Sequence, residues 1–228
     1  MGWNDRFNQI SRGTMDVLFP RKCPFCGLPI GKELLCASCG KDLPFTEGQA
    51  VRRGADYGRC AAPLYYDDKV RSAVHDLKFH GKLGGLPCFG SLMADCAAEH
   101  YAGEFDAITW VPVSKKRLKK RGYDQSRYLA ASVCVDWHVP PVETLEKTVD
   151  NPPQSGLRDA AARRANVLGV YRAVNTEQIA GKRWLVIDDV LTSGATLGEC
   201  ARVLKEAGAQ DVLCLTLAMA RDENWEQW

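Results

Sequence analysis

Apolar residues recur first with a helical period and later in runs of strand length. In residues 3–19 the apolar positions lie three and four apart, and Pro20, which cannot continue a helix, follows them. This pattern predicts an amphipathic N-terminal helix over residues 1–20, and packing on the chain's own domain is favoured over a membrane or partner contact. Residues 21–45 carry proline and glycine at short intervals, which predicts turns rather than a packed core.

From residue 63 onward, strand-like and helical patterns alternate, as in an α/β domain. We predict helices near residues 70–77, 125–135 and 196–207, and strands at 107–112, 169–174, 183–189 and 211–219. The stretch 183–219 has the length and order of one βαβ unit. Its unbroken apolar run 184–187 indicates a parallel strand covered on both faces, so we expect a mainly parallel, twisted sheet with flanking helices. Residues 140–166 read as a loop or hood outside the sheet core.

Length and composition limit the number of domains and the kinds of partner. With 228 residues, 46% hydrophobic and 25% charged, the chain suits one medium domain plus a small module. A net charge of +2 argues against a globally basic nucleic-acid binder, so such contact requires a local patch. No apolar run approaches the roughly 18 residues of a membrane span, and the N-terminus lacks a secretory pattern. We therefore predict no membrane insertion and a cytoplasmic location.

Four of the ten cysteines are clustered. They form two C-x₂-C pairs separated by nine residues, which suits a tetrahedral S₄ zinc site. A disulfide pair is disfavoured in a reducing cytosol, and a redox pair is disfavoured because there are two pairs. Since protein fills all four positions, the predicted zinc is structural; its ligands are Cys23, Cys26, Cys36 and Cys39. The remaining cysteines are scattered singly and read as small buried hydrophobic residues.

The sharpest signal is the segment that follows the apolar run 184–187. Asp188 and Asp189 stand at the strand's carboxyl end, where ligands bind in open α/β sheets. A turn of glycine and hydroxyl residues then enters a helix, and its N–H groups suit a phosphate. Two acids beside a phosphate suit a vicinal diol, so together they indicate a ribose 5-phosphate. The alternative is an ordinary capped strand end. The candidate binding residues after the acids are Val190, Leu191, Thr192, Ser193, Gly194, Ala195 and Thr196.

Residues 186–196 resemble the motif of type I phosphoribosyltransferases that binds phosphoribosyl pyrophosphate (PRPP). The resemblance implies that Asp188 and Asp189, our candidate catalytic residues, hold the ribose hydroxyls, and that residues 192–196 hold the 5′-phosphate. It also implies a second strand-end loop that holds pyrophosphate together with Mg²⁺. A solvated loop is the alternative for that basic stretch, whose candidate residues are Ser114, Lys115, Lys116 and Arg117.

The order of motifs along the chain resembles the ComF family. Besides the cysteine pairs and the PRPP motif, the strings Leu77-Lys78-Phe79-His80-Gly81, Val111-Pro112-Val113 and Arg121-Gly122-Tyr123-Asp124-Gln125-Ser126 carry it. The resemblance implies a type I phosphoribosyltransferase-like domain over residues 63–228 with a hood at about 118–170, a zinc-finger module and connector over 21–62, and a role in DNA uptake during natural transformation. Two departures stand out: only Cys60 remains of a second cysteine group, and Asp124 replaces the usual Asn.

Three functions stay open on the sequence. The first is pentosyl transfer from PRPP to an acceptor that the sequence does not name. The second is a PRPP sensor without chemistry. The third is an adaptor that binds single-stranded DNA or proteins of the uptake machinery through the zinc module and basic stretches such as 115–121. The four histidines show no metal-ligand spacing and read as surface or helix-end residues; His80 lies in a motif-like string near the expected pocket. A homo-oligomer is left open.

Overall fold

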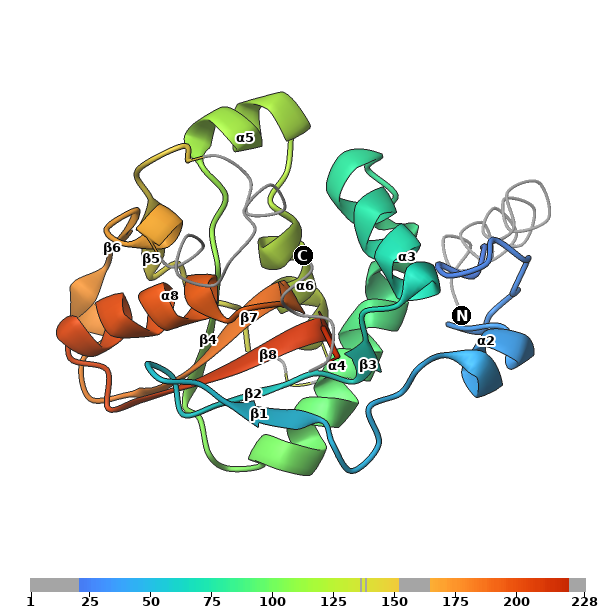
Figure 1. Cartoon of the computed structure of the whole chain (residues 1–228), viewed down its shortest axis with the longest axis horizontal. Helices are drawn as coiled ribbons and strands as arrows, with labels where there is room; N and C mark the ends of the chain where they lie inside the picture. The colour runs from blue at the N-terminus through green and yellow to red at the C-terminus, as the bar shows by residue number, and fades with distance from the viewer. Residues whose placement is uncertain (1–20, 136, 138, 152–164, 222–228) are drawn as a thin grey trace, which may run out of the picture.

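The computed structural model describes residues 21–135, 137, 139–151 and 165–221 (Figure 1). The predicted N-terminal helix over residues 1–20 lies outside this part of the chain, as do residues 152–164 of the predicted hood.

A six-stranded sheet organises the domain. Its order is β1-β2-β8-β7-β4, with β3 also pairing with β8. All pairs are parallel except β1 with β2. The strands are β1 (Val51–Arg53), β2 (Arg59–Ala61), β3 (Leu64–Tyr65), β4 (Ala107–Trp110), β7 (Arg183–Leu191) and β8 (Asp211–Met219). The predicted parallel sheet and its βαβ unit are confirmed, and β7 runs two residues beyond the predicted end.

The segment expected to be a connector also contributes to this sheet. β1 and β2 form a hairpin, and Cys60 of β2 pairs in register with Cys214 of β8. Apolar and polar residues do not alternate clearly along this segment, so the sequence did not predict β1 and β2.

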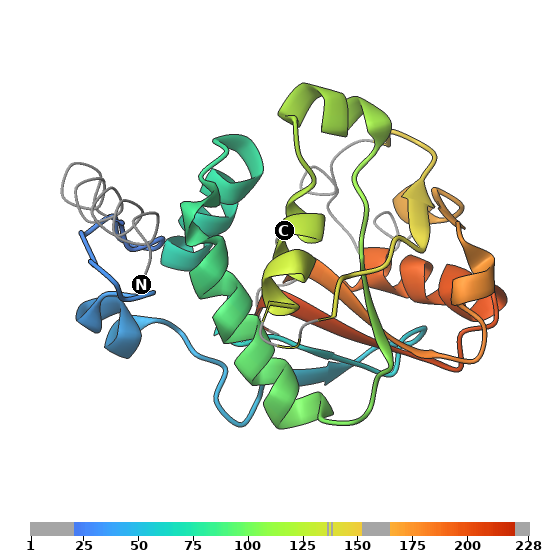
Figure 2. The ribbon, with the colours of Figure 1, turned by 180° about the vertical axis from the view of Figure 1, so that it is seen from behind.

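Helices cover both faces of the sheet, as the apolar run of β7 indicated. Leu185 and Ile187 pack in one cluster with α3 (Asp68–Phe79), α4 (Leu86–Tyr101) and α6 (Gln125–Val133). Trp184 and Val186 face the opposite side, against α8 (Ala195–Glu206). Figure 1 shows α8 in front of the sheet, and Figure 2, seen from the opposite side, shows α4 and α6 in front of it. The helices predicted near 70–77, 125–135 and 196–207 are present.

A second, two-stranded antiparallel sheet lies apart from the main one. It pairs β5 (Leu145–Lys147) with β6 (Tyr171–Ala173), so the strand predicted at 169–174 exists but belongs to this small sheet. The remaining elements are short: α2 (Ala37–Asp42), α5 (Lys115–Arg121), and single turns at Leu83–Gly85 and Thr176–Gln178.

The basic stretch expected to be a loop is the helix α5. The Ser114 hydroxyl caps it by accepting a hydrogen bond from the Arg117 N–H, and Gly122, with φ of 84°, ends it. The sequence predicted a loop because α5 has no buried residue and therefore no apolar period. Among the described residues, no helix is long and apolar enough to cross a bilayer.

Candidate functional site

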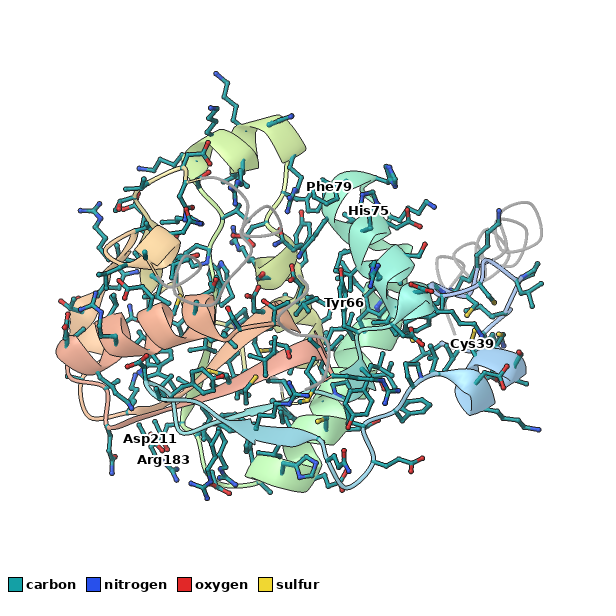
Figure 3. All side chains as sticks on the ribbon, viewed as in Figure 1. Cys39, Tyr66, His75, Phe79, Arg183 and Asp211 are labelled. Carbon is teal, nitrogen blue, oxygen red and sulfur yellow. The ribbon has the colours of Figure 1, made fainter. Side chains whose placement is uncertain are left out.

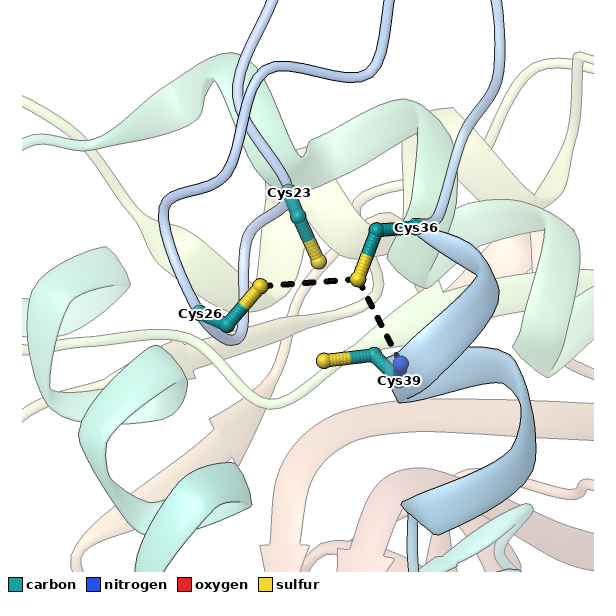
Figure 4. Close-up of side chains that lie close together, drawn as sticks. All are labelled: Cys23, Cys26, Cys36 and Cys39. Carbon is teal, nitrogen blue, oxygen red and sulfur yellow. Dashed lines mark hydrogen bonds between the residues drawn. The ribbon is translucent and has the colours of Figure 1, made fainter.

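The four clustered cysteines converge as predicted (Figure 4). Their sulfur atoms all lie within 4.8 Å of one another, and the Cys26 and Cys36 sulfurs are 3.5 Å apart. Tetrahedral zinc with bonds of about 2.3 Å places its thiolates about 3.8 Å apart, so the cluster fits zinc. The Cys39 N–H donates to the Cys36 sulfur over 3.3 Å. Although burial opposes it, backbone N–H groups around Cys23 lower the pKa of its thiol to about 7.

The zinc module is anchored to the domain by a small apolar contact. Phe25, between the first two cysteines, meets Phe89 of α4 edge-on, with ring centroids 5.6 Å apart. Cys60 lies away from this module: it is fully buried in the main sheet, with its sulfur 4.0 Å from the Thr216 hydroxyl. Cys60 is therefore a core residue, and no second cysteine cluster exists among the described residues.

The two acids of the predicted phosphate motif lie at the carboxyl end of β7. Asp189 is 4% exposed, and Lys78 of α3 contacts its Oδ1 over 2.8 Å. Gln125, the first residue of α6, donates from Nε2 to Asp189 Oδ2 over 3.1 Å. The next residue, Ser126, donates its hydroxyl to Asp188 Oδ1 over 2.9 Å. The acid pair is thus held by two helices that are distant from it in the sequence.

Burial and neighbouring charges shift the pKa values of Asp188 and Lys78. Burial, followed by the negative charge of Asp189, raises the pKa of Asp188 to about 7. Burial alone would lower the pKa of Lys78, but Asp189 and Asp188 raise it above its ordinary value. Lys78 therefore stays charged and balances Asp189, while Asp188 takes up a proton near neutral pH.

The acids open onto a cavity of about 640 Å³ between α3, α5 and the end of β7. The side chains of Tyr66, His75 and Phe79 lie along its α3 side (Figure 3). Its charged lining, among the described residues, consists of two carboxylates and five cations: Asp188, Asp189, Arg71, Lys78, Arg117, Arg121 and Lys147. Such a lining suits a ligand that carries both hydroxyl groups and several negative charges.

The predicted phosphate loop divides between two hollows. Val190, Thr192 and Thr196 line the larger cavity, while Leu191 is buried. The other residues, Ser193, Gly194 and Ala195, line a second hollow of about 320 Å³. Gly194 adopts φ of +75° immediately before α8, and a Cβ there would lie 2.6 Å from the Tyr57 hydroxyl oxygen. Only glycine therefore fits this turn.

The four residues predicted to bind pyrophosphate do not all face the cavity. Lys115 and Lys116 are about 85% exposed and contact Glu146 and Asp150 outside the cavity, at 2.6 and 3.5 Å. Ser114 caps α5 and donates its hydroxyl to Asp150. Among these four candidates only Arg117 lines the cavity.

Sequence reasoning did not assign the other four cations of the lining. They come from α3 (Arg71 and Lys78), from the last residue of α5 (Arg121) and from β5 (Lys147). Lys78 and Arg121 carried a signal, because each lies in one of the strings that mark the ComF resemblance. Arg71 and Lys147 lie in patterns typical of ordinary solvated surfaces.

Asp124 has a structural position. Its Oδ1 accepts hydrogen bonds from the backbone N–H groups of Ser126 and Arg127, and its Oδ2 accepts from that of Val113 over 3.0 Å. It therefore caps α6 and ties the end of β4 to this helix. Asp124 does not line the cavity.

The fold and the site define a type I phosphoribosyltransferase-like domain with an N-terminal zinc module. Two family models agree with this class: a phosphoribosyl transferase domain matches residues 139–228, and a double zinc ribbon domain matches residues 14–69. The described residues hold one four-cysteine cluster within the ribbon match.

Relatives match over most of the chain. The chain is 30% identical over 205 residues to DNA utilization protein YhgH of Escherichia coli O157:H7, covering 86% of this chain and 84% of the relative. It is 24% identical over 218 residues to Competence protein F of Haemophilus influenzae, covering 92% and 95%. It is 26% identical over 196 residues to Competence protein ComFC of Bacillus subtilis, covering 86% and 76%. The chain belongs to the ComF family.

Proposed function

We propose that this protein binds PRPP in the 640 Å³ cavity and acts in the uptake or use of DNA. One observation carries the first part: Asp188 and Asp189 open onto the same cavity as Thr192 and Thr196. This arrangement supports a binding mode in which the two carboxylates accept hydrogen bonds from the ribose hydroxyls and the 5′-phosphate lies at the start of α8. The second part is supported by the names of the relatives, which are competence and DNA utilization proteins.

The pyrophosphate of PRPP needs positive charge, and the cavity supplies it from residues other than those expected. We propose that Arg117, Arg121 and Lys147 replace Lys115 and Lys116 in this role, because only the former line the cavity. Magnesium suits a ligand of this kind, since Mg²⁺ binds largely through substrate phosphates and one or two carboxylates. We assign Asp188 to this role, because it lines the cavity and the Lys78 ammonium pairs with Asp189 instead.

Calorimetry with PRPP and Mg²⁺ tests the binding site. We expect Asp189→Asn to weaken binding at least tenfold, because a ribose hydroxyl loses an ionised acceptor. Asp95→Asn is the matched control, since this carboxylate is exposed on α4 and does not line the cavity. Equal heats for the wild type and an Asp188→Asn/Asp189→Asn double variant would rule out a site at this motif.

Transfer and sensing differ in one measurable product. In transfer, an acceptor attacks C1 of the ribose and pyrophosphate leaves; in sensing, PRPP binds and dissociates unchanged. Pyrophosphate release with PRPP and a panel of bases and amines separates them. Release that requires one acceptor and is lost in Asp189→Asn supports transfer, whereas binding without release for every acceptor supports a sensor.

The helix α5 favours the adaptor as a second candidate function. Its sequence KKRLKKR has no buried residue, so its lysines face solvent beside the cavity. A cluster of this kind suits phosphate groups of a nucleic acid. A Lys116→Ala/Lys119→Ala/Lys120→Ala variant tests it with single-stranded DNA at several salt concentrations. An unchanged affinity, or an affinity that does not fall with salt, excludes α5 as the interface.

A further inference from the structure

The end of α3 gathers a second group of metal-ligand side chains. His75, Asp76 and His80 each offer one ligand atom, and these atoms lie within 4.8 Å of one another. The two imidazole rings have centroids 5.1 Å apart and an interplanar angle of 68°. This group is separate from the cysteine cluster and from the acid pair of β7.

The helix end explains why the spacing of the histidines concealed this group. Five positions separate His75 from His80, which does not suit a continuous α-helix, where side chains three or four apart are neighbours. His80, however, is the C-cap of α3, with φ of −110° and ψ of 3°. Because the chain leaves the helix there, the His80 ring lies beside the His75 ring.

The carboxylate of Asp76 is already oriented by its neighbours. Its Oδ1 lies 2.7 Å from Nδ1 of His80, and its Oδ2 accepts from the Lys82 ammonium over 2.7 Å. Lys82 binds Oδ2 of Asp76, whereas His80 contacts Oδ1. A cation bound at Oδ1 therefore leaves the Lys82 contact in place. Hydrogen-bonded carboxylates of this kind are common at metal sites.

The donor set selects a class of metal. Two imidazole nitrogens and one carboxylate oxygen suit Zn²⁺, Co²⁺ or Ni²⁺, and are unlike the all-oxygen sets of Ca²⁺ and Mg²⁺. Metal bonds of 2.0–2.1 Å place neighbouring tetrahedral ligands about 3.3 Å apart, so Asp76 and His80 must separate slightly. The side chains allow this movement, since that of His80 is 55% exposed.

We propose that His75, Asp76 and His80 form a second metal site, which binds a divalent transition metal with three protein ligands and an open fourth position. His75 also lines the 640 Å³ cavity, so this metal lies at the rim of that cavity. Unlike the cysteine site, whose four positions are all filled by protein, this site offers a coordination position to water or to an anion. The proposal does not depend on PRPP binding.

Cobalt titration of the full chain, with its cysteine site already loaded with zinc, tests the proposal. We expect one further equivalent of Co²⁺ to bind, with weak visible bands and without the intense thiolate-to-cobalt absorption of a cysteine site. His75→Ala and His80→Ala should each weaken this binding at least tenfold. His100→Ala is the matched control, because His100 lies on α4 next to Glu99 and away from this group.

Three outcomes overturn the second site. The first is the absence of a further equivalent at millimolar Co²⁺ in the zinc-loaded wild type. The second is binding that persists unchanged in the His75→Ala/His80→Ala double variant, and the third is an equal loss of binding in His100→Ala. Thermal melting of each variant without added cobalt establishes that the chain is folded, as expected because His75 and His80 are exposed and His100 is partly exposed.

Discussion

The zinc module and the acid pair both bring acidic groups close together, and they balance the negative charge differently. In the module, four thiols lie within 4.8 Å of one another, and a metal ion binds all of them. At the end of β7, two carboxylates are adjacent, and an ammonium group from α3 binds one of them. The module has few buried apolar residues around its cysteines, whereas the acids end a strand that is buried on both faces.

This difference separates a permanent site from an exchangeable one. A four-thiolate zinc ion leaves no position for a ligand, so the module is structural. Lys78 satisfies Asp189 but leaves Asp188 facing the cavity with a raised pKa. Incomplete charge balance costs stability and keeps the carboxylate available, which is typical of functional sites.

Removal of zinc has the largest expected effect. Cys23→Ser should abolish zinc binding and unfold residues 21–45, because structural zinc contributes on the order of 10 kcal/mol to folding of small modules. The main sheet should remain folded, since most of its core, including the whole cluster under α8, lies outside the module. Zinc content and hydrogen exchange measure the two effects. Cys134→Ala, at a buried cysteine on α6's C-terminal end, is the control and should keep its zinc. Full zinc content in Cys23→Ser contradicts the four-thiolate site.

Removal of the ammonium group has the next largest effect. Lys78→Met leaves the buried Asp189 without its cation and should destabilise the fold at neutral pH by about 3 kcal/mol. Denaturant unfolding measures this loss. Asp189→Asn in the same chain should recover part of it, because the uncompensated charge is then gone. Lys82→Met, at an exposed lysine, should change stability by less than about 1 kcal/mol. Strictly additive effects of Lys78→Met and Asp189→Asn are incompatible with the pair.

The turn that follows the acids should tolerate no side chain. Gly194→Ala should cost about 2 kcal/mol or more, from the positive φ and from contact with the Tyr57 hydroxyl. Gly181→Ala separates the two causes, because Gly181 has φ of +73° and nothing within 4 Å of an added Cβ. Thermal unfolding of both variants gives the comparison. If the two lose equal stability, the contact with Tyr57 has no effect on the turn.

The smallest effect concerns the protonation of Asp188. Its pKa is raised to about 7, so between about pH 4 and 7 the folded state holds a proton that the unfolded chain has released, and stability falls as pH rises. Asp188→Asn mimics the protonated form. It should match the wild type near pH 4 and be more stable by about 1 kcal/mol or more at pH 8. Melting curves at the two pH values measure this difference, and a variant that is less stable at pH 8 contradicts the raised pKa.

The sequence alone determined the features that depend on neighbouring residues. Each of the cysteine pairs, the strand that carries Asp188 and Asp189 near its carboxyl end, and the glycine turn before α8 is a contiguous stretch of sequence, so local spacing was enough to predict it. The parallel sheet was also predictable, because an unbroken apolar strand must be buried on both faces. The sequence also identified the basic stretch that forms α5 as a candidate anion site, but it did not indicate which of its side chains reach the cavity.

Only the tertiary structure decided which distant groups meet. Lys78 and Gln125 reach Asp189 because α3 and α6 pack on one face of the sheet. His75 and His80 come together because α3 ends at His80, a geometry that helical spacing does not encode. Lys115 and Lys116 turn away from the cavity because Glu146 and Asp150 lie beside α5. Charged side chains form ion pairs with the groups that lie near them in the folded chain. The packing of helices on the sheet determines which groups are near, and the order of residues in the sequence does not.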